Sequence, residues 1–118
     1  QVKGGLVQGL GGGLFEELAY DDFGQLTTGS LMDYLLPTAS DVPPITVLHQ
    51  EVPSPLNAFG VKGLGEGGAI APPVVIANAV CDALRPFGAE LNSTPVRWGD
   101  VAAFFGDDPF EISEPSPA

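Results

Sequence analysis

The sequence contains very few of the residues on which metal clusters and disulfides depend. Cys81 is the only cysteine and His49 the only histidine among 118 residues, so no internal disulfide and no cysteine metal cluster can form. Cys81 lies in an apolar stretch and is expected to pack as a small core residue. We expect a structural role for His49 as well, and we assign no residue as a metal ligand.

Basic residues are also scarce. Lys and Arg together number 4 against 15 Asp and Glu, which gives a formal net charge of -11. Proteins hold a phosphate backbone mainly with basic side chains, so the composition excludes nucleic acid as a partner. An anionic cofactor would have to be held by backbone N–H groups.

Long apolar runs are absent. No stretch reaches the ~18 uninterrupted apolar residues that a bilayer-spanning helix requires, and no signal peptide is recognisable. We therefore expect no membrane span and a cytoplasmic location. The sequence begins at Gln1, and 44% of its residues are hydrophobic. We interpret it as a piece of a larger protein whose remaining polypeptide covers part of this apolar surface.

The spacing of apolar residues predicts three helices. Leucines recur every four residues from Leu6 to Leu18, as on the buried face of a first helix. Pro72 and Pro73 mark the start of a second helix, which is apolar on most sides and is therefore expected to be buried. A third, short helix is predicted within residues 95–105.

The remaining segments favour short strands. Residues 16–36 are expected to form a hairpin with its turn at residues 21–24, residues 45–52 a strand, and residues 89–91 a shorter one. The sequence thus predicts an α+β fold, with helices packed on a small mixed or antiparallel sheet over residues 1–105. An irregular acidic tail is expected at residues 106–118.

Several glycines fall inside the first predicted helix, and each costs about 0.5–1 kcal/mol relative to Ala in a helix interior. Two explanations stay open. A ligand or another backbone presses against a face without side chains, or a second helix packs there through small residues. The glycines in question are Gly9, Gly11, Gly12 and Gly13.

Residues 60–68 carry five glycines around Glu66, which is typical of a backbone bent tightly against a large group. The glycine spacing in this segment matches the sequence pattern of a dinucleotide-binding fingerprint. Residues 53–59 before it contain two prolines and no β-branched run, which argues against a Rossmann turn. Glu66 is either a general base presented in a cleft or a cap for the N–H groups of the second helix.

Four segments together resemble the C-terminal region of molybdenum hydroxylase large subunits, the family of xanthine dehydrogenase, aldehyde oxidase and carbon monoxide dehydrogenase. They occur in the family's order, and the resemblance extends from Gln1 to about Phe105. The segments are QVKGGLVQGLG at residues 1–11, LFEE at 14–17, GVKGLGE at 60–66 and IANAVCDA at 76–83.

The resemblance implies a molybdenum–molybdopterin cofactor, which we expect in the cytosine dinucleotide form. Glu66 matches the general base, Gln1 matches a residue that hydrogen-bonds the pterin, and the loop formed by Lys62, Gly63, Leu64 and Gly65 matches backbone near the cofactor. The implied partners are the remainder of the subunit, an iron–sulfur subunit and an FAD subunit.

The resemblance also implies the reaction. An aldehyde, an N-heterocycle or a carbon monoxide-like substrate would be hydroxylated or oxidised, with water as the oxygen source. The alternative is a non-catalytic structural piece that is stable only with a partner chain.

Overall fold

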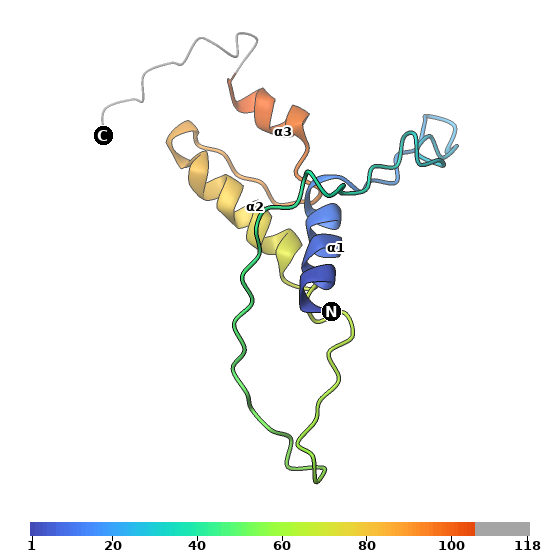
Figure 1. Ribbon diagram of the computed structural model, residues 1–118. Coiled ribbons are helices and arrows are strands. Elements are labelled where there is room, and N and C mark those ends of the chain that lie inside the picture. The colour runs from blue at the N-terminus through green and yellow to red at the C-terminus, as the bar shows by residue number, and fades with distance from the viewer. Residues whose placement is uncertain (106–118) are drawn as a thin grey trace.

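The computed structural model describes residues 1–105, and the predicted acidic tail lies outside the described residues. Its α-helices are α1 (Val2–Leu14), α2 (Pro72–Ala83) and α3 (Trp98–Ala102), and short 3-10 turns follow α2 and α3. Helices α1 and α2 pack against each other, and α3 lies beside the C-terminal half of α2 (Figure 1). None of these helices is long and apolar enough to cross a membrane.

All three predicted helices are confirmed, and local chemistry explains where two of them begin and end. Helix α1 ends at Leu14, where the N–H groups of Phe15 and Glu16 both donate to the carbonyl oxygen of Gly11, at 2.8 and 2.9 Å. Helix α2 begins at a proline pair, whose missing N–H does no harm in a first turn. A 3-10 turn and Gly88, at φ 70°, then reverse the chain after α2.

The expectation that α2 is a buried helix is wrong for residues 1–105. Only Ala77 of α2 is buried, whereas Val74 and Val75 are 61% and 60% exposed. One face of α2 packs on α1, and the segment before α3 covers part of another, where the N–H of Leu91 donates to the Sγ atom of Cys81 at 3.2 Å. A helix that is apolar on most sides and yet exposed is typical of a helix that a larger structure encloses.

The predicted sheet is also wrong, because the described residues contain no strand. The expected hairpin over residues 16–36 is reduced to one antiparallel bridge between Tyr20 and Leu26. Residues 45–52 and 89–91 have no strand partner within residues 1–105. A strand needs a neighbouring backbone with which to exchange hydrogen bonds, and a strand-like composition alone does not supply one. The regular structure of the described chain is helical.

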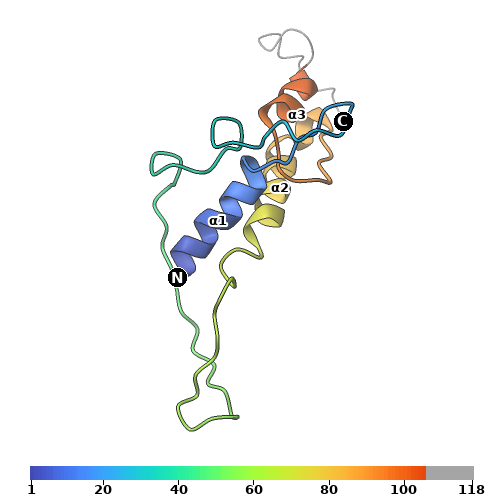
Figure 2. The ribbon, with the colours of Figure 1, turned by 90° about the vertical axis from the view of Figure 1, so that its right-hand side faces the viewer.

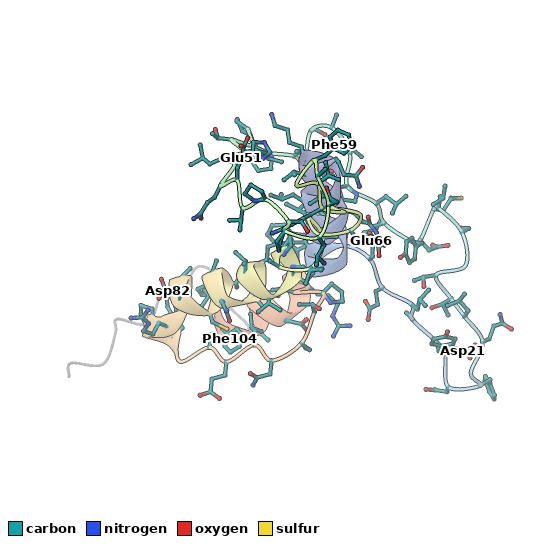
Figure 3. The ribbon with its side chains drawn as sticks, turned by 90° about the horizontal axis from the view of Figure 1, so that it is seen from below. Asp21, Glu51, Phe59, Glu66, Asp82 and Phe104 are labelled. Atoms are coloured by element: carbon teal, nitrogen blue, oxygen red, sulfur yellow. The ribbon has the colours of Figure 1, made fainter. Side chains whose placement is uncertain are left out.

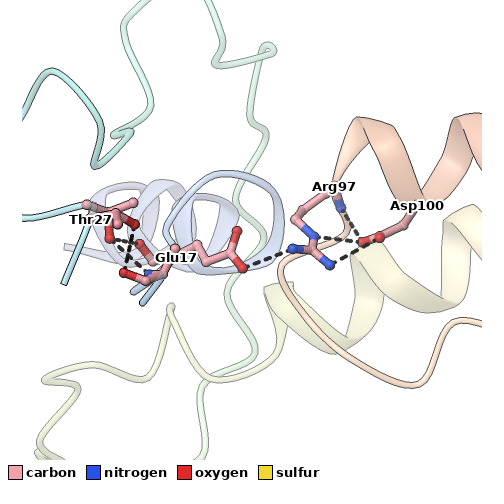
Figure 4. Close-up of polar contacts among 6 residues, drawn as sticks. Glu17, Thr27, Arg97 and Asp100 are labelled. Carbon is pink, nitrogen blue, oxygen red and sulfur yellow. Dashed lines mark hydrogen bonds and ion pairs between the residues drawn. The ribbon is translucent and has the colours of Figure 1, made fainter. Parts of the chain in front are cut away.

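The core is small and lies where α1, α2 and the segment before α3 meet. The N–H of Val96 donates to the carbonyl oxygen of Gly13 at 2.7 Å, and Arg97 reaches Glu17 beside it (Figure 4). No side chain among residues 1–105 is less than 2% exposed. The buried apolar residues are Ala77, Leu84, Ala89 and Val96.

A long connection joins α1 to α2. It leaves the C-terminal end of α1, extends far from the helices, turns, and returns to the beginning of α2 (Figures 1 and 2). The N–H of Ser54 donates to the carbonyl oxygen of Gly60 at 2.9 Å and closes the distal turn. The glycine-rich loop that carries Glu66 lies on the returning part, just before α2.

Candidate functional site

A stripe of glycines on α1 contacts the loop before α2 and α2 itself. A Cβ atom built on Gly5 would lie 3.0 Å from the Cα of Gly68. A Cβ on Gly9 would lie 2.8 Å from the carbonyl oxygen of Ala69, and one on Gly13 would lie 3.0 Å from the Cδ1 of Ile76. The first-helix glycines at positions 9 and 13 are therefore explained by close approach of this chain's own backbone and of α2.

The other glycines of α1 differ from these. A Cβ on Gly11 would meet the Oε1 atom of Glu16 and would lie 3.0 Å from the Cδ of Pro37. The hydroxyl of Tyr34 donates to the Oε2 atom of the same Glu16 at 2.5 Å. A Cβ on Gly12 would have no such neighbour within 4 Å. The glycines at positions 9, 11, 12 and 13 thus have three different surroundings. Gly5, one helical turn before Gly9, was not predicted from the sequence.

Gln1 lies against the loop that was predicted to adjoin the cofactor. Its Nε2 atom donates to the carbonyl oxygen of Gly65 at 2.7 Å, although the two residues are 64 positions apart. Residues 59–64 line a hollow of about 740 Å³ together with residues 49–53. The structure thus places Gln1 against Gly65, the last residue of the loop of Lys62 to Gly65, and the role of these residues toward the pterin stays a prediction.

Glu66 is exposed on the glycine-rich loop (Figure 3). Two backbone hydrogen bonds shape this loop, one from the N–H of Gly67 to the carbonyl oxygen of Leu64 and one from the N–H of Ala69 to that of Glu66, both at 2.8 Å. The N-cap residue of α2 is Ala71, and no side chain caps that end. The capping alternative for Glu66 is therefore wrong.

The loop offers the donors that an anionic or amide-rich cofactor needs. Within residues 1–105, the backbone N–H groups of Lys62, Gly63, Leu64 and Gly65 donate no hydrogen bond. A Cβ built on Gly63 or Gly65 would meet nothing within 4 Å, so space is open beside this backbone. Backbone N–H groups in a bent loop can bind anions, and such donors matter in a chain that has only 4 basic residues.

The chain matches a family model described as a molybdopterin cofactor-binding domain over residues 1–43. It is 53% identical over 82% of its length to the nicotine 6-hydroxylase large subunit of Paenarthrobacter nicotinovorans. It is 37% identical over 81% of its length to a putative xanthine dehydrogenase molybdenum-binding subunit of Escherichia coli. Each match covers 12% of the relative.

Solved structures extend the match across the candidate site. The chain superposes on quinoline 2-oxidoreductase from Pseudomonas putida 86 with a TM-score of 0.84 and 42% identity, covering 92% of this chain and 14% of that one. For carbon monoxide dehydrogenase from Oligotropha carboxidovorans the TM-score is 0.81 at 30% identity, covering 88% and 13%.

These matches define a part of a molybdopterin-binding subunit. The chain belongs to the family of large subunits that includes xanthine dehydrogenase, aldehyde oxidase and carbon monoxide dehydrogenase. It spans 12% of the nicotine 6-hydroxylase large subunit and 6% of an aldehyde oxidase. The family resemblance predicted from the four sequence segments is confirmed.

Proposed function

We propose that this chain is the part of a molybdenum-dependent oxidoreductase that presents Glu66 as the general base. The observation that carries the proposal is the hydrogen bond from Gln1 to Gly65, which places Gln1 against the residue that directly precedes Glu66. The redox chemistry would come from the molybdenum–molybdopterin group, in our proposal as its cytosine dinucleotide. Electrons would leave through iron–sulfur and FAD partners.

The residues of this chain would bind and position the reactants. The free N–H groups of residues 62–65 would donate to the cofactor, while Gln1 holds this loop against the start of α1. Glu66 would accept a proton at its carboxylate as the substrate is hydroxylated. A base in position contributes about 10²–10⁴-fold to a rate, whereas the cofactor supplies the larger share.

For the substrate, we propose an aromatic N-heterocycle that is hydroxylated with oxygen from water. The relatives at 53% and 42% identity carry the names nicotine 6-hydroxylase and quinoline 2-oxidoreductase, and both nicotine and quinoline contain a six-membered aromatic ring with nitrogen. Identity falls to 36% for a carbon monoxide dehydrogenase large chain and to 35% for an aldehyde oxidoreductase subunit.

The test is Glu66→Gln in the complete subunit, assembled with its partners. The amide keeps the size of the side chain and cannot accept the proton, so turnover of an N-heterocycle should fall by about 10²-fold or more, with molybdenum content unchanged. Glu90→Gln, which alters an exposed acid outside the site, is the control. Equal single-turnover rates for Glu66→Gln and the parent at equal metal loading would remove Glu66 from this role.

A second candidate function is purely structural, in which the chain completes a larger fold without supplying a catalytic group. The observation that favours it is the amount of exposed apolar surface: Leu48, Leu56 and Phe59 are 89%, 91% and 90% exposed. An apolar groove of about 350 Å³ also lies between α1 and α2, lined in part by Leu6, Leu10 and Val75. The Glu66→Gln measurement separates the two candidates, because a structural piece would tolerate the change.

A further inference from the structure

We infer that Gly5 and Gly68 form a spacer without side chains that sets the position of Glu66 relative to α1. The inference rests on the proposed function of Glu66 as the base. Gly5 and Gly68 are positioning residues in it, since they act through the loop and not on the substrate.

The contact between Gly5 and Gly68 is backbone against backbone. A Cβ on Gly5 would lie 3.0 Å from the Cα of Gly68 and 3.3 Å from the backbone nitrogen of Ala69. From the other side, a Cβ on Gly68 would lie 2.7 Å from the carbonyl oxygen of Val2 and 3.1 Å from the Cα of Gly5. Backbone atoms cannot rotate away as the end of a side chain can, so any side chain here separates the loop from the helix.

Space is what requires glycine at these two positions. Neither Gly5 nor Gly68 has a positive φ, so an L-residue could adopt the backbone conformation of both. Gly65 is the opposite case, with φ 48° and nothing within 4 Å of a built Cβ. The loop around Glu66 thus uses glycine in two ways, for conformation at Gly65 and for close approach at Gly68.

The loop transmits this spacing to Glu66 because it is fixed at both ends. Gly65, on one side of Glu66, accepts the hydrogen bond from Gln1 at 2.7 Å. On the other side, Gly68 is seated on Gly5, and the N–H of Ala69 donates to the carbonyl oxygen of Glu66 at 2.8 Å. A methyl group at position 5 would move Gly68 outward while Gln1 retains Gly65, and would therefore turn the carboxylate of Glu66.

Gly4 provides a matched control on the same helix. It is the neighbour of Gly5, yet a Cβ built on it meets nothing within 4 Å. Gly4→Ala and Gly5→Ala add the same methyl group and the same helix propensity. They differ in whether that group meets the glycine-rich loop, since Gly5 is buried against the loop and Gly4 is exposed.

The experiment compares Gly5→Ala, Gly68→Ala and Gly4→Ala in the complete, cofactor-loaded enzyme. A misplacement of about 1 Å can cost 10²-fold in rate, so we expect kcat to fall by about that factor in the first two variants, with KM and molybdenum content close to those of the parent. We also expect faster hydrogen exchange at the amides of Gly67 and Ala69, which report the loop directly. Gly4→Ala should match the parent in every measurement.

Two results would overturn the spacer. Parental turnover and exchange rates in Gly5→Ala and Gly68→Ala, beside an inactive Glu66→Gln, would refute it and leave the proposed function standing. Loss of molybdenum or of subunit stability in the two variants would refute it too, since the contact would then serve folding and not the base. Full activity of Glu66→Gln would instead overturn the proposed function. The spacer inference would then fail as well, because it rests on Glu66 acting as the base.

Discussion

The Nη1 atom of Arg97 donates a hydrogen bond to the Oε1 atom of Glu17 at 3.0 Å, across 80 positions of sequence (Figure 4). The same guanidinium donates from Nε to the Oδ2 atom of Asp100, also at 3.0 Å. The hydrogen bond to Asp100, and then the charges of Asp100 and Glu17, raise the pKa of Arg97 further above its usual range. One cation therefore joins the segment after α1 to the first turn of α3.

Arg97→Gln should loosen α3 while leaving the pair of α1 and α2 in place. The side-chain amide of glutamine cannot bind both carboxylates. The backbone N–H groups of residues 98–105 should therefore exchange their hydrogens with solvent severalfold faster. Arg85→Gln is the control, because Arg85 pairs with Asp82 only three positions away. Unchanged exchange in residues 98–105 of Arg97→Gln would show that the ion pair does not hold α3.

The hydrogen bond from Tyr34 to Glu16 should give an alkaline dependence of local stability. That bond, followed by burial and the charge of Glu16, raises the pKa of Tyr34 above its usual value. A group with a raised pKa in the folded state contributes stability fully below its unfolded value of about 10, and this contribution is lost as pH rises through the folded value.

Glu16→Gln should therefore lower the midpoint of the Tyr34 titration, which NMR of ring-labelled tyrosine can follow. A Tyr34→Phe variant identifies the resonance. An identical midpoint in Glu16→Gln and the parent would mean that the hydrogen bond does not persist in solution.

Replacing Gly65 should damage the loop through its backbone conformation. Its φ of 48° lies in the left-handed region, which costs an L-residue roughly 1–2 kcal/mol. We expect Gly65→Val to reduce molybdenum retention in the complete subunit. Gly65→Asn should retain more, since asparagine tolerates this conformation better.

Gly24→Val is the matched control for Gly65→Val, because Gly24 also has a positive φ, of 78°, and a built Cβ there also meets nothing within 4 Å, but it lies in the turn at residues 21–24 and outside the loop. Metal analysis of purified subunits is the measurement. Full molybdenum occupancy in a folded Gly65→Val subunit would show that this loop does not adjoin the cofactor.

The 118-residue chain on its own should self-associate or bind a hydrophobic dye. Large exposed apolar patches on a soluble chain mark missing partners or a tendency to aggregate, and Val74, Val75, Leu56 and Phe59 are all largely exposed. Its acidic charge opposes association only over about 10 Å at 0.1 M salt. Size-exclusion chromatography with dye binding is the measurement. A dye-negative monomer with a cooperative melt would contradict the prediction.

The helices were predictable because their signals are local. Leucine spacing predicted α1, the proline pair predicted the start of α2, and the acidic turn at residues 21–24 forms as expected, with the Oδ1 atom of Asp21 accepting from the N–H groups of Phe23 and Gln25 at 2.9 Å. Each signal depends on residues a few positions apart, which a sequence displays directly.

The sheet and the burial of α2 were not predictable, since both depend on what lies beside a segment. Residues 45–52 contain several β-branched side chains, as strands do, but this composition does not say which backbone pairs with them. The apolar composition of α2 likewise predicts a cover without saying which polypeptide provides it.

The candidate site was also predictable only in part. The roles of Glu66 and Gln1 were predicted from the family resemblance, because spacing alone did not decide whether Glu66 is a general base or a helix cap. The partnership of Gly5 with Gly68 joins distant parts of the chain, and a sequence does not show such pairs. The repeat of glycine at positions 5, 9 and 13 was the available signal, because every fourth residue of a helix faces the same neighbour.

The hydrogen bond between Gln1 and Gly65 also constrains the order in which this region can fold. Closing a loop whose ends are 64 positions apart costs conformational entropy of about 4 kcal/mol by the simple chain estimate. A glycine-rich helix as short as α1 is only marginally stable alone, so it gains its support when α2 and the returning loop arrive. The helix pair and the surroundings of Glu66 should therefore form late and together, in one cooperative step.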